Sequence, residues 1–262
     1  MPKSGLEEGS LFENKLKRKL SAGKTTLGVW VSIPSPDVSE ILSLMGFDWL
    51  VFDTEHSPMD VSTAQVLIQA MKGEETTPII RVAWNDPVMI KRALDVGAHG
   101  VVVPWVNSRE DAINAVRACK YPPKGIRGCG PRRAERYGLD KEYLSRADAE
   151  TMVIVQIEHI DAVHHIDEIL GTPGVDAFFI GPADLSASMG YLGQRTHPKV
   201  LETIEKILDA GRRAKVPSGI FSFSLDHVPK LVEQGFQFIA VGGDTSLLMR
   251  GAREALSMAK KG

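Results

Sequence analysis

The chain is poor in cysteine. Only Cys119 and Cys129 occur among 262 residues, and two cysteines are too few for a disulfide framework in a chain of this length. A reducing compartment is expected, and the cytoplasm fits best. Long apolar runs are also missing from the first thirty residues, where acidic residues and the basic segment 15–19 interrupt every apolar stretch. We therefore expect neither a signal peptide nor a membrane span there.

Neither charge sign is in excess. Lys and Arg number 31 against 33 acidic residues, which gives a formal net charge of -2. Such a balance provides no electrostatic basis for binding nucleic acid or an anionic membrane surface. The expected partner is a small-molecule substrate.

Several catalytic signatures are absent. The chain has no G-x-G-x-x-G after its first predicted strand, no G-x-S-x-G and no C-x-x-C. These absences leave no basis for a dinucleotide-binding, acyl-transfer or thiol redox function. No predicted strand carries a lysine at its carboxyl end, since Lys215 precedes its strand. A Schiff-base mechanism therefore lacks its nucleophile.

The chain does contain a regular alternation of short β-rich runs and amphipathic segments. Eight strands with helices between them predict one closed (β/α)8 TIM barrel over residues 1–262, with its active site at the carboxyl ends of the strands. An open doubly wound sheet is the alternative, but it usually has fewer strands and a Gly-rich first turn. Residues 6–21 are predicted to form a leading helix that closes the barrel floor. The predicted strands are 27–33, 49–53, 78–82, 100–106, 152–158, 176–180, 217–221 and 238–241.

Two acidic residues follow two of these strands. Glu158 ends V-I-V-Q-I-E, and Asp184 follows F-F-I-G-P-A. Acids at the carboxyl ends of neighbouring barrel strands meet at the mouth, where two carboxylates could bind Mg²⁺ or Mn²⁺ and leave the remaining positions to water and substrate. Neutralisation of both acids by arginines is the alternative. Gln156 shares the inward face with Glu158, so this face becomes polar only at its end.

The second and third strands bring further polar groups to the mouth. Asp53-Thr54-Glu55-His56 follows W-L-V-F, and a histidine there can exchange a proton near neutral pH. Arg81 lies inside the third strand, where a buried guanidinium needs an anionic partner. That partner is either a structural acid, such as Asp53 or Glu55, or an anionic substrate oxygen, and the sequence alone leaves both open.

Three other segments have more than one interpretation. Gly181-Pro182-Ala183, ahead of Asp184, is a tight turn whose backbone N–H groups could also approach a substrate carboxylate. Gly242-Gly243-Asp244 is either a phosphate cradle or only a turn with a helix cap. The long segment 120–150, which is rich in Arg, Gly and Pro, could form a basic lid, a subunit contact or a solvated excursion.

Five sequence blocks, in this order, resemble the HpcH/HpaI family of class II pyruvate aldolases, and the resemblance runs from about Leu16 to the last helix. The blocks are G-F-D-W-L-V-F-D-T-E-H-S-P (46–58), R-V-A-W-N-D-P (81–87), Y-P-P-K-G-I-R-G (121–128), V-Q-I-E (155–158) and F-I-G-P-A-D-L-S (179–186).

The resemblance implies a metal-dependent reaction on pyruvate. It implies Mg²⁺, Mn²⁺ or Co²⁺ held by Glu158 and Asp184, with the keto and carboxylate oxygens of pyruvate on the ion. Arg81 would stabilise the enolate, and His56, oriented through Asp95, would act as acid and base. The implied activity is the formation or cleavage of 4-hydroxy-2-oxo acids, and the implied pathway is the catabolism of aromatic compounds.

Other residues complete the implied site. Asp53 belongs to the catalytic set, and the backbone at Ala183 and Asp184 would hold the pyruvate carboxylate. The resemblance also implies a hexamer in which the C-terminal helix, 244–260, packs on a neighbouring barrel. The implied substrate-binding residues are Arg81, Gln156, Gly181, Pro182, Ala183, Asp184, Trp30 and Phe221.

The sequence departs from the family pattern at positions that are expected to surround the aldehyde substrate. Thr54 stands where many relatives have Gly. The segment 129–133 differs from the smaller, Ser- and Ala-rich loop of the heptanedioate enzymes, and 221–223 is bulkier than their apolar loop. The sequence therefore leaves the acceptor aldehyde open. Two alternative functions also remain: a decarboxylase that uses the same enolate, acting on oxaloacetate or resembling macrophomate synthase, and a non-catalytic binding barrel.

Overall fold

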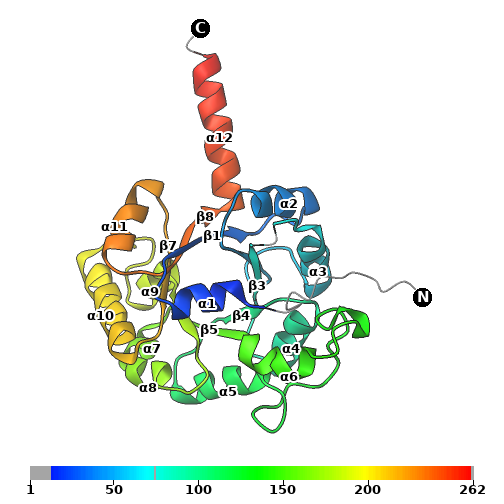
Figure 1. Ribbon diagram of the computed structural model, residues 1–262. Helices are drawn as coiled ribbons and strands as arrows, with labels where there is room; N and C mark the ends of the chain where they lie inside the picture. Colours follow the sequence, from blue (N-terminus) through cyan, green and yellow to red (C-terminus); the bar gives the residue numbers. More distant parts are fainter. Residues whose placement is uncertain (1–12, 74, 261–262) are drawn as a thin grey trace.

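Eight parallel strands close into a barrel in the computed structural model, which describes residues 13–73 and 75–260 (Figure 1). Neighbouring strands pair in chain order, and the last strand pairs with the first. The strands are β1 (Thr26–Val31), β2 (Trp49–Asp53), β3 (Thr77–Arg81), β4 (Gly100–Val103), β5 (Met152–Ile157), β6 (Ala177–Ile180), β7 (Ser218–Phe221) and β8 (Phe238–Gly243). The predicted barrel is confirmed, and each predicted strand overlaps an observed one.

Helices surround the barrel, as Figure 1 shows. They begin at residues that favour helix starts: Asp60 and Ser108 accept hydrogen bonds from backbone N–H groups of the first turn, and Pro occupies the first turn of several helices. The helices are α1 (Lys15–Ser21), α2 (Pro36–Leu44), α3 (Val61–Ala70), α4 (Pro87–Asp95), α5 (Arg109–Cys119), α6 (Tyr143–Glu150), α7 (Ile160–His164), α8 (Ile166–Leu170), α9 (Pro182–Ser188), α10 (Pro198–Ala214), α11 (Val228–Glu233) and α12 (Asp244–Ala259), with 3-10 turns η1 (Arg136–Gly138) and η2 (Leu225–His227).

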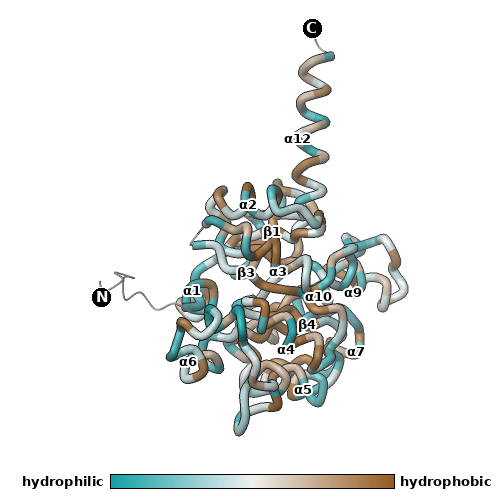
Figure 2. The backbone as a smooth tube through the Cα atoms, turned by 90° about the vertical axis from the view of Figure 1, so that its right-hand side faces the viewer, coloured by the Kyte–Doolittle hydropathy of each residue, from teal (hydrophilic) through white to brown (hydrophobic). Residues whose placement is uncertain are grey.

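The core has two layers because successive strand residues point to opposite faces. In β5, Met152 and Ile154 belong to the cluster inside the barrel, whereas Val153 and Val155 belong to the cluster between strands and helices. Both faces of the strands are apolar, and the strands are brown in Figure 2. The inward face of β5 becomes polar only at Gln156, as predicted.

Helix α1 closes one end of the barrel. Leu16 and Leu20 are buried and belong to the cluster inside the barrel, and α1 lies across this end in Figure 1. The predicted leading helix is therefore confirmed for Lys15–Ser21. Its first part, residues 6–12, lies outside the described residues. The amino-terminal ends of the strands thus form a closed floor.

The long segment 120–150 lies on this floor. It leaves the end of α5 and enters β5, so both of its ends are at the floor side of the barrel. Lys120 Nζ donates to the carbonyl oxygens of Asp148 (2.7 Å) and Thr151 (2.9 Å), which fixes the segment beneath the barrel. A lid over the mouth of the same barrel is excluded by this position. A subunit contact stays a prediction.

Helix α12 projects away from the barrel (Figure 1). Leu247 packs against the core, but most other apolar side chains of α12 are exposed, including Leu248 (65%) and Leu256 (56%). At its start, the Asp244 carboxylate accepts hydrogen bonds from the backbone N–H groups of Ser32 (2.8 Å) and Ile33 (2.7 Å). The Asp244 carboxylate therefore already lies at the Gly242-Gly243 turn. This position favours the interpretation of 242–244 as a turn with a helix cap over a phosphate cradle. Packing of α12 on a neighbouring barrel stays a prediction.

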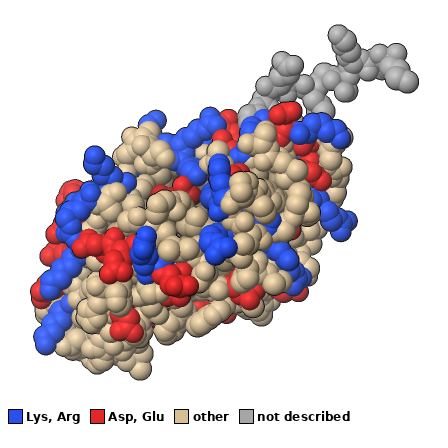
Figure 3. Space-filling view, turned by 90° about the horizontal axis from the view of Figure 1, so that it is seen from below, with Lys and Arg blue, Asp and Glu red and all other residues tan. Residues whose placement is uncertain are grey.

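Charges of both signs are interspersed on the face seen in Figure 3, in keeping with the balanced composition. Within residues 13–73 and 75–260, no helix combines the length and apolar character needed to span a membrane.

Candidate active site

A buried ion-pair network lies at the mouth, between β2 and β3. Arg81 is 8% exposed, and its Nε and Nη2 donate to the two carboxylate oxygens of Asp53 at 3.0 and 2.7 Å. Its Nη1 lies 3.1 Å from Glu55 Oε2, and its guanidinium lies 5.3 Å from the ring centre of Trp30. The structure therefore brings both candidate structural acids to Arg81. Two of its five N–H groups have no part in these three contacts.

Asp53 also shapes the loop that carries His56. Its Oδ1 accepts from the backbone N–H groups of Glu55 (3.0 Å) and His56 (3.2 Å). The His56 side chain is 63% exposed, and its Nε2 lies 3.7 Å from Glu55 Oε1. One carboxylate thus fixes both the arginine and the backbone of the histidine. The His56 ring is left at the edge of the cavity described below.

Glu158 is buried at the end of β5 and is held by hydrogen bonds. Its Oε1 accepts from the backbone N–H of Trp105 at 2.9 Å, and its Oε2 accepts from Gln156 Nε2. Burial, together with the negative charges of Glu55 and Asp184, raises the pKa of Glu158 to about 7, and the hydrogen bonds from Trp105 and Gln156 oppose this shift. Trp105 has φ of +56°, in the left-handed region that a tryptophan rarely adopts. This backbone geometry accompanies the N–H contact to Glu158.

Gly181 allows the start of α9 to lie against Glu158. A Cβ at this position would lie 3.0 Å from both the Cβ and Oε2 of Glu158, so only glycine fits without displacement. Asp184 lies in the first turn of α9 and is exposed. The predicted turn and the predicted metal ligands are therefore neighbours.

These elements enclose a cavity of about 200 Å³ at the mouth. Trp30 and Phe221, from the first and seventh strands, form part of its aromatic wall, with ring centres 6.1 Å apart. Every predicted substrate-binding residue lines this cavity, and His56 lines it too. The lining residues are Trp30, His56, Arg81, Gln156, Phe179, Ile180, Gly181, Pro182, Ala183, Asp184, Phe221 and Phe223.

The carboxylates at the mouth repel one another. Burial raises the pKa of Glu55 to about 7, with Asp53 and Asp184 adding to the effect and Arg81 opposing it. A divalent cation would relieve this repulsion, and carboxylate oxygens suit Mg²⁺ or Mn²⁺. Within the described part of the chain, no group of three or more His, Cys, Asp or Glu side chains could hold an ion by itself. Glu158 and Asp184 are close enough for the charge of Asp184 to raise the pKa of Glu158, and as oxygen donors they suit a hard cation; their role as metal ligands stays a prediction.

Asp95 lies elsewhere. It is the last residue of α4, which runs from mouth to floor, and its Oδ1 accepts from Arg127 Nη2 at 2.7 Å. The Arg127 side chain is fully buried, so Asp95 supplies the anion that this guanidinium requires. Within one chain, Asp95 and His56 are at opposite ends of the barrel. The implied orientation of His56 through Asp95 is therefore not found in a single chain.

Five residues of the site were not among the predicted site residues: Glu55, Trp105, Phe179, Ile180 and Phe223. Glu55 was considered only as a structural partner of Arg81, although it also lies beside the His56 ring. Its position directly after a strand could have identified it. Trp105 follows β4 in the same way. Phe223 lines the cavity, but only the bulk of 221–223 indicated it.

Comparison with known proteins gives consistent matches along the chain. The sequence model of the HpcH/HpaI aldolase/citrate lyase family matches residues 26–251. A 5-keto-4-deoxy-D-glucarate aldolase from Salmonella arizonae is 39% identical over 253 residues, covering 96% of this chain and 99% of the relative. A 4-hydroxy-2-oxo-heptane-1,7-dioate aldolase from Shigella sonnei is 43% identical over 248 residues, covering 94% of both chains.

Solved structures match over the same extent. An HpcH/HpaI aldolase/citrate lyase family protein from Burkholderia cenocepacia superposes with a TM-score of 0.91 at 37% identity, covering 94% of this chain and 99% of the other. Macrophomate synthase superposes with a TM-score of 0.84 at 28% identity, covering 98% of this chain and 95% of the other.

Proposed function

Because the chain belongs to the HpcH/HpaI aldolase/citrate lyase family, a family of carbon–carbon lyases, we propose that it is a divalent-metal-dependent aldolase. It would form or cleave 4-hydroxy-2-oxo acids through a pyruvate enolate and an aldehyde. One observation carries the proposal: a buried arginine and the candidate metal ligand Asp184 line one cavity, with Glu158 against its Gly181 wall. Such a cavity can hold an anionic substrate and absorb the charge of its enolate.

Glu158 and Asp184 are the proposed ligands of Mg²⁺, Mn²⁺ or Co²⁺. When bound, the ion supplies Lewis-acid stabilisation of the charge that develops on the substrate keto oxygen. Gln156 supports this arrangement because its amide holds Glu158 from the same strand.

Arg81 is proposed to stabilise the enolate oxygen. Its contacts with Asp53 and Glu55 prevent rotation of the guanidinium while leaving two N–H groups for substrate. The backbone N–H groups of Ala183 and Asp184, in the first turn of α9, lack partners within the helix and are proposed to bind the pyruvate carboxylate.

His56 is the proposed acid and base. In the cleavage direction the 4-hydroxyl group gives up its proton, the C3–C4 bond breaks and the aldehyde leaves. The enolate then takes a proton at C3, which yields pyruvate. Within one chain, Glu55 is the carboxylate beside the His56 ring. A contact between His56 and Asp95 would require a second chain.

Proton exchange at the pyruvate methyl group tests the proposal without an aldehyde. The protein is stripped with chelator, dialysed and resupplied with Mg²⁺, Mn²⁺ or Co²⁺, and exchange in D₂O is followed by NMR. We expect exchange only with metal, and its loss in Glu158→Gln. Glu202→Gln, an exposed glutamate on α10 paired with Lys206, is the matched control and should exchange like wild type. Absence of exchange with every metal in folded protein would favour a non-catalytic barrel.

Oxaloacetate decarboxylation is the second candidate function, because it would reach the same enolate by a different bond cleavage. The likeness to macrophomate synthase over 98% of this chain favours keeping it. Retro-aldol turnover and oxaloacetate decarboxylation should be measured on one preparation. A higher kcat/KM for decarboxylation would replace the aldolase assignment.

A further inference from the structure

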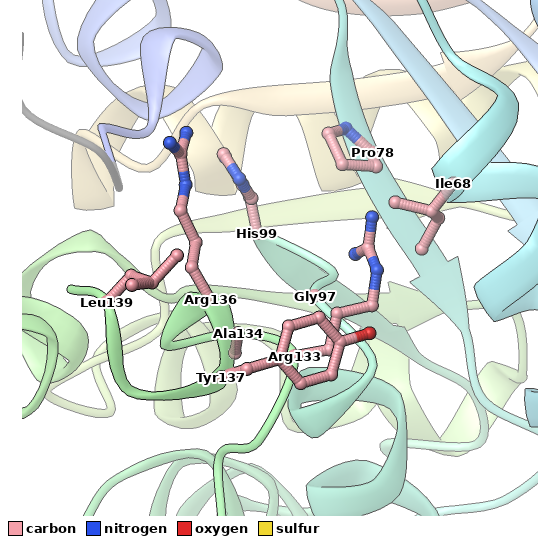
Figure 4. A pocket seen from close by; sticks show the side chains of 9 residues that line it. All are labelled: Ile68, Pro78, Gly97, His99, Arg133, Ala134, Arg136, Tyr137 and Leu139. Carbon is pink, nitrogen blue, oxygen red and sulfur yellow. The ribbon is translucent and has the colours of Figure 1, made fainter. Parts of the chain in front are cut away.

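A second cavity, of about 300 Å³, lies at the floor of the barrel, far from the mouth. Pro78 is the second residue of β3 and His99 precedes β4, while Ile68 is near the end of α3. The loop that follows 130 forms the opposite wall. The lining residues, labelled in Figure 4, are Ile68, Pro78, Gly97, His99, Arg133, Ala134, Arg136, Tyr137 and Leu139.

The Arg133 side chain is held in this cavity by a hydrogen bond to Val96 and by close packing against Gly97. Its Nη1 donates to the carbonyl oxygen of Val96 at 2.7 Å. Gly97 has φ of +101°, and a Cβ there would lie 2.2 Å from Arg133 Nη1. The guanidinium therefore occupies space that only glycine leaves open.

The charge of Arg133 has no acidic partner in the part of the chain that the structure describes. No ion pair joins it to an Asp or Glu among residues 13–73 and 75–260, and burial lowers its pKa. A half-buried guanidinium with one hydrogen bond to a carbonyl keeps donors for a ligand. An anion would satisfy both its charge and these donors.

Arg136 lines the same cavity. In Figure 4 its side chain and that of Arg133 extend from the loop on either side of His99. Burial lowers the pKa of His99, Glu150 opposes this effect, and Arg133 and Arg136 add smaller lowering effects.

The loop is held in a strained shape. Arg132, Arg136 and Tyr137 have φ of 30°, 52° and 56°, in or near the left-handed region that costs energy for residues other than glycine. Such strain persists where the surrounding structure fixes it, and it often accompanies ligand sites.

We propose that this floor cavity binds a small organic anion. The guanidinium group of Arg133 binds its carboxylate or phosphate group, and Ile68, Pro78 and Leu139 contact its apolar body. The volume of about 300 Å³ suits a small metabolite. The site is independent of the proposed aldolase function, because it shares no residue with the mouth.

Calorimetric titration of the full chain, stripped of metal and dialysed free of chelator, tests this site. Succinate and inorganic phosphate are titrated separately at constant ionic strength, so that the tighter ligand identifies the anionic group. Arg133→Gln should weaken binding by at least about tenfold, the effect of losing charged hydrogen bonds. Arg133→Lys, which keeps the charge, should lose less. Arg132→Gln is the matched control: Arg132 is exposed on the same loop and does not line the cavity.

Three results would overturn the proposal. One is equal binding by wild type and Arg133→Gln, with unchanged urea midpoints showing that both are folded. Another is binding that Arg81→Gln abolishes and Arg133→Gln does not, which would place the anion at the mouth. Absence of any binding to wild type would also refute the site for these two anions.

Discussion

Replacement of Asp53 by Asn should destabilise the protein and impair its chemistry together. Asp53 accepts two hydrogen bonds from Arg81 and one each from the backbone N–H groups of Glu55 and His56. Asparagine keeps the shape but loses the charge, and it presents an NH₂ group where an acceptor is needed. Its effect therefore reports on the whole network around the arginine.

The magnitude follows from the burial of the pair. Breaking a buried ion pair costs roughly 3–5 kcal/mol because one charge is left without its partner. Arg81 keeps its contact with Glu55 at 3.1 Å, so we expect the lower end, about 3 kcal/mol. The misplaced Arg81 and His56 should also slow pyruvate exchange by about 10²-fold.

Urea unfolding at fixed protein concentration measures the stability change, and NMR exchange in D₂O measures the activity. Asp209→Asn is the control, because Asp209 and Arg212 form an ion pair with both side chains more than half exposed. Its loss should cost under about 0.5 kcal/mol. Asp53→Asn combined with Arg81→Gln should cost less than the sum of the single changes. Additive effects, or an Asp53→Asn cost no larger than that of the control, would refute the reasoning.

Three further predictions concern other parts of the chain. Gly181→Ala should weaken metal binding by at least about tenfold, because its Cβ would lie 3.0 Å from Glu158 Oε2; an unchanged metal titration would contradict the packing described. The pKa of His99 is lowered to about 4 by burial, so the unfolded chain binds a proton that the folded chain does not between about pH 4 and 6.5. Stability should fall by up to about 3 kcal/mol as pH falls through this window, and His99→Gln should remove that slope in urea unfolding at each pH. Leu248→Glu with Leu256→Glu should reduce the size of the assembly in sedimentation velocity if α12 packs on a neighbouring barrel, and an unchanged size would count against that packing.

The barrel was predictable because each strand is apolar on both faces and each helix has an apolar stripe. The same regularity placed the mouth residues, since a residue just past a parallel strand can only be at the carboxyl-terminal edge. Arg81, Glu158 and Asp184 were found in this way. Applied to helices, the rule would also have placed Asp95 at the floor, because a helix that follows a strand ends on the opposite side of the barrel.

The sequence did not predict the contacts between side chains of neighbouring strands, because these contacts depend on the register of the strands. The burial of Glu55 beside both Arg81 and His56 comes from β2 and β3 lying in register, with Asp53 opposite Arg81. The close contact of Gly181 with Glu158 depends on β5 and β6 in the same way. The floor cavity depends on a loop with unusual backbone angles. No local sequence pattern in 131–139 predicts these angles.

The contact between Asp244 and the loop after β1 adds to the pairing of β1 with β8, in which Trp30 lies opposite Gly243, and fixes the start of α12 against this loop. Ser32 and Ile33 follow directly after β1, close to Trp30 in the cavity wall. Their backbone N–H groups donate hydrogen bonds to the carboxylate of Asp244, the first residue of α12. If α12 packs on a neighbouring chain, we expect a partner that reorients α12 to shift the loop beside the proposed substrate site. By thermodynamic linkage, a ligand that fixes this loop would then change the affinity of α12 for that partner by the same factor. Assembly and substrate binding would in that case be coupled.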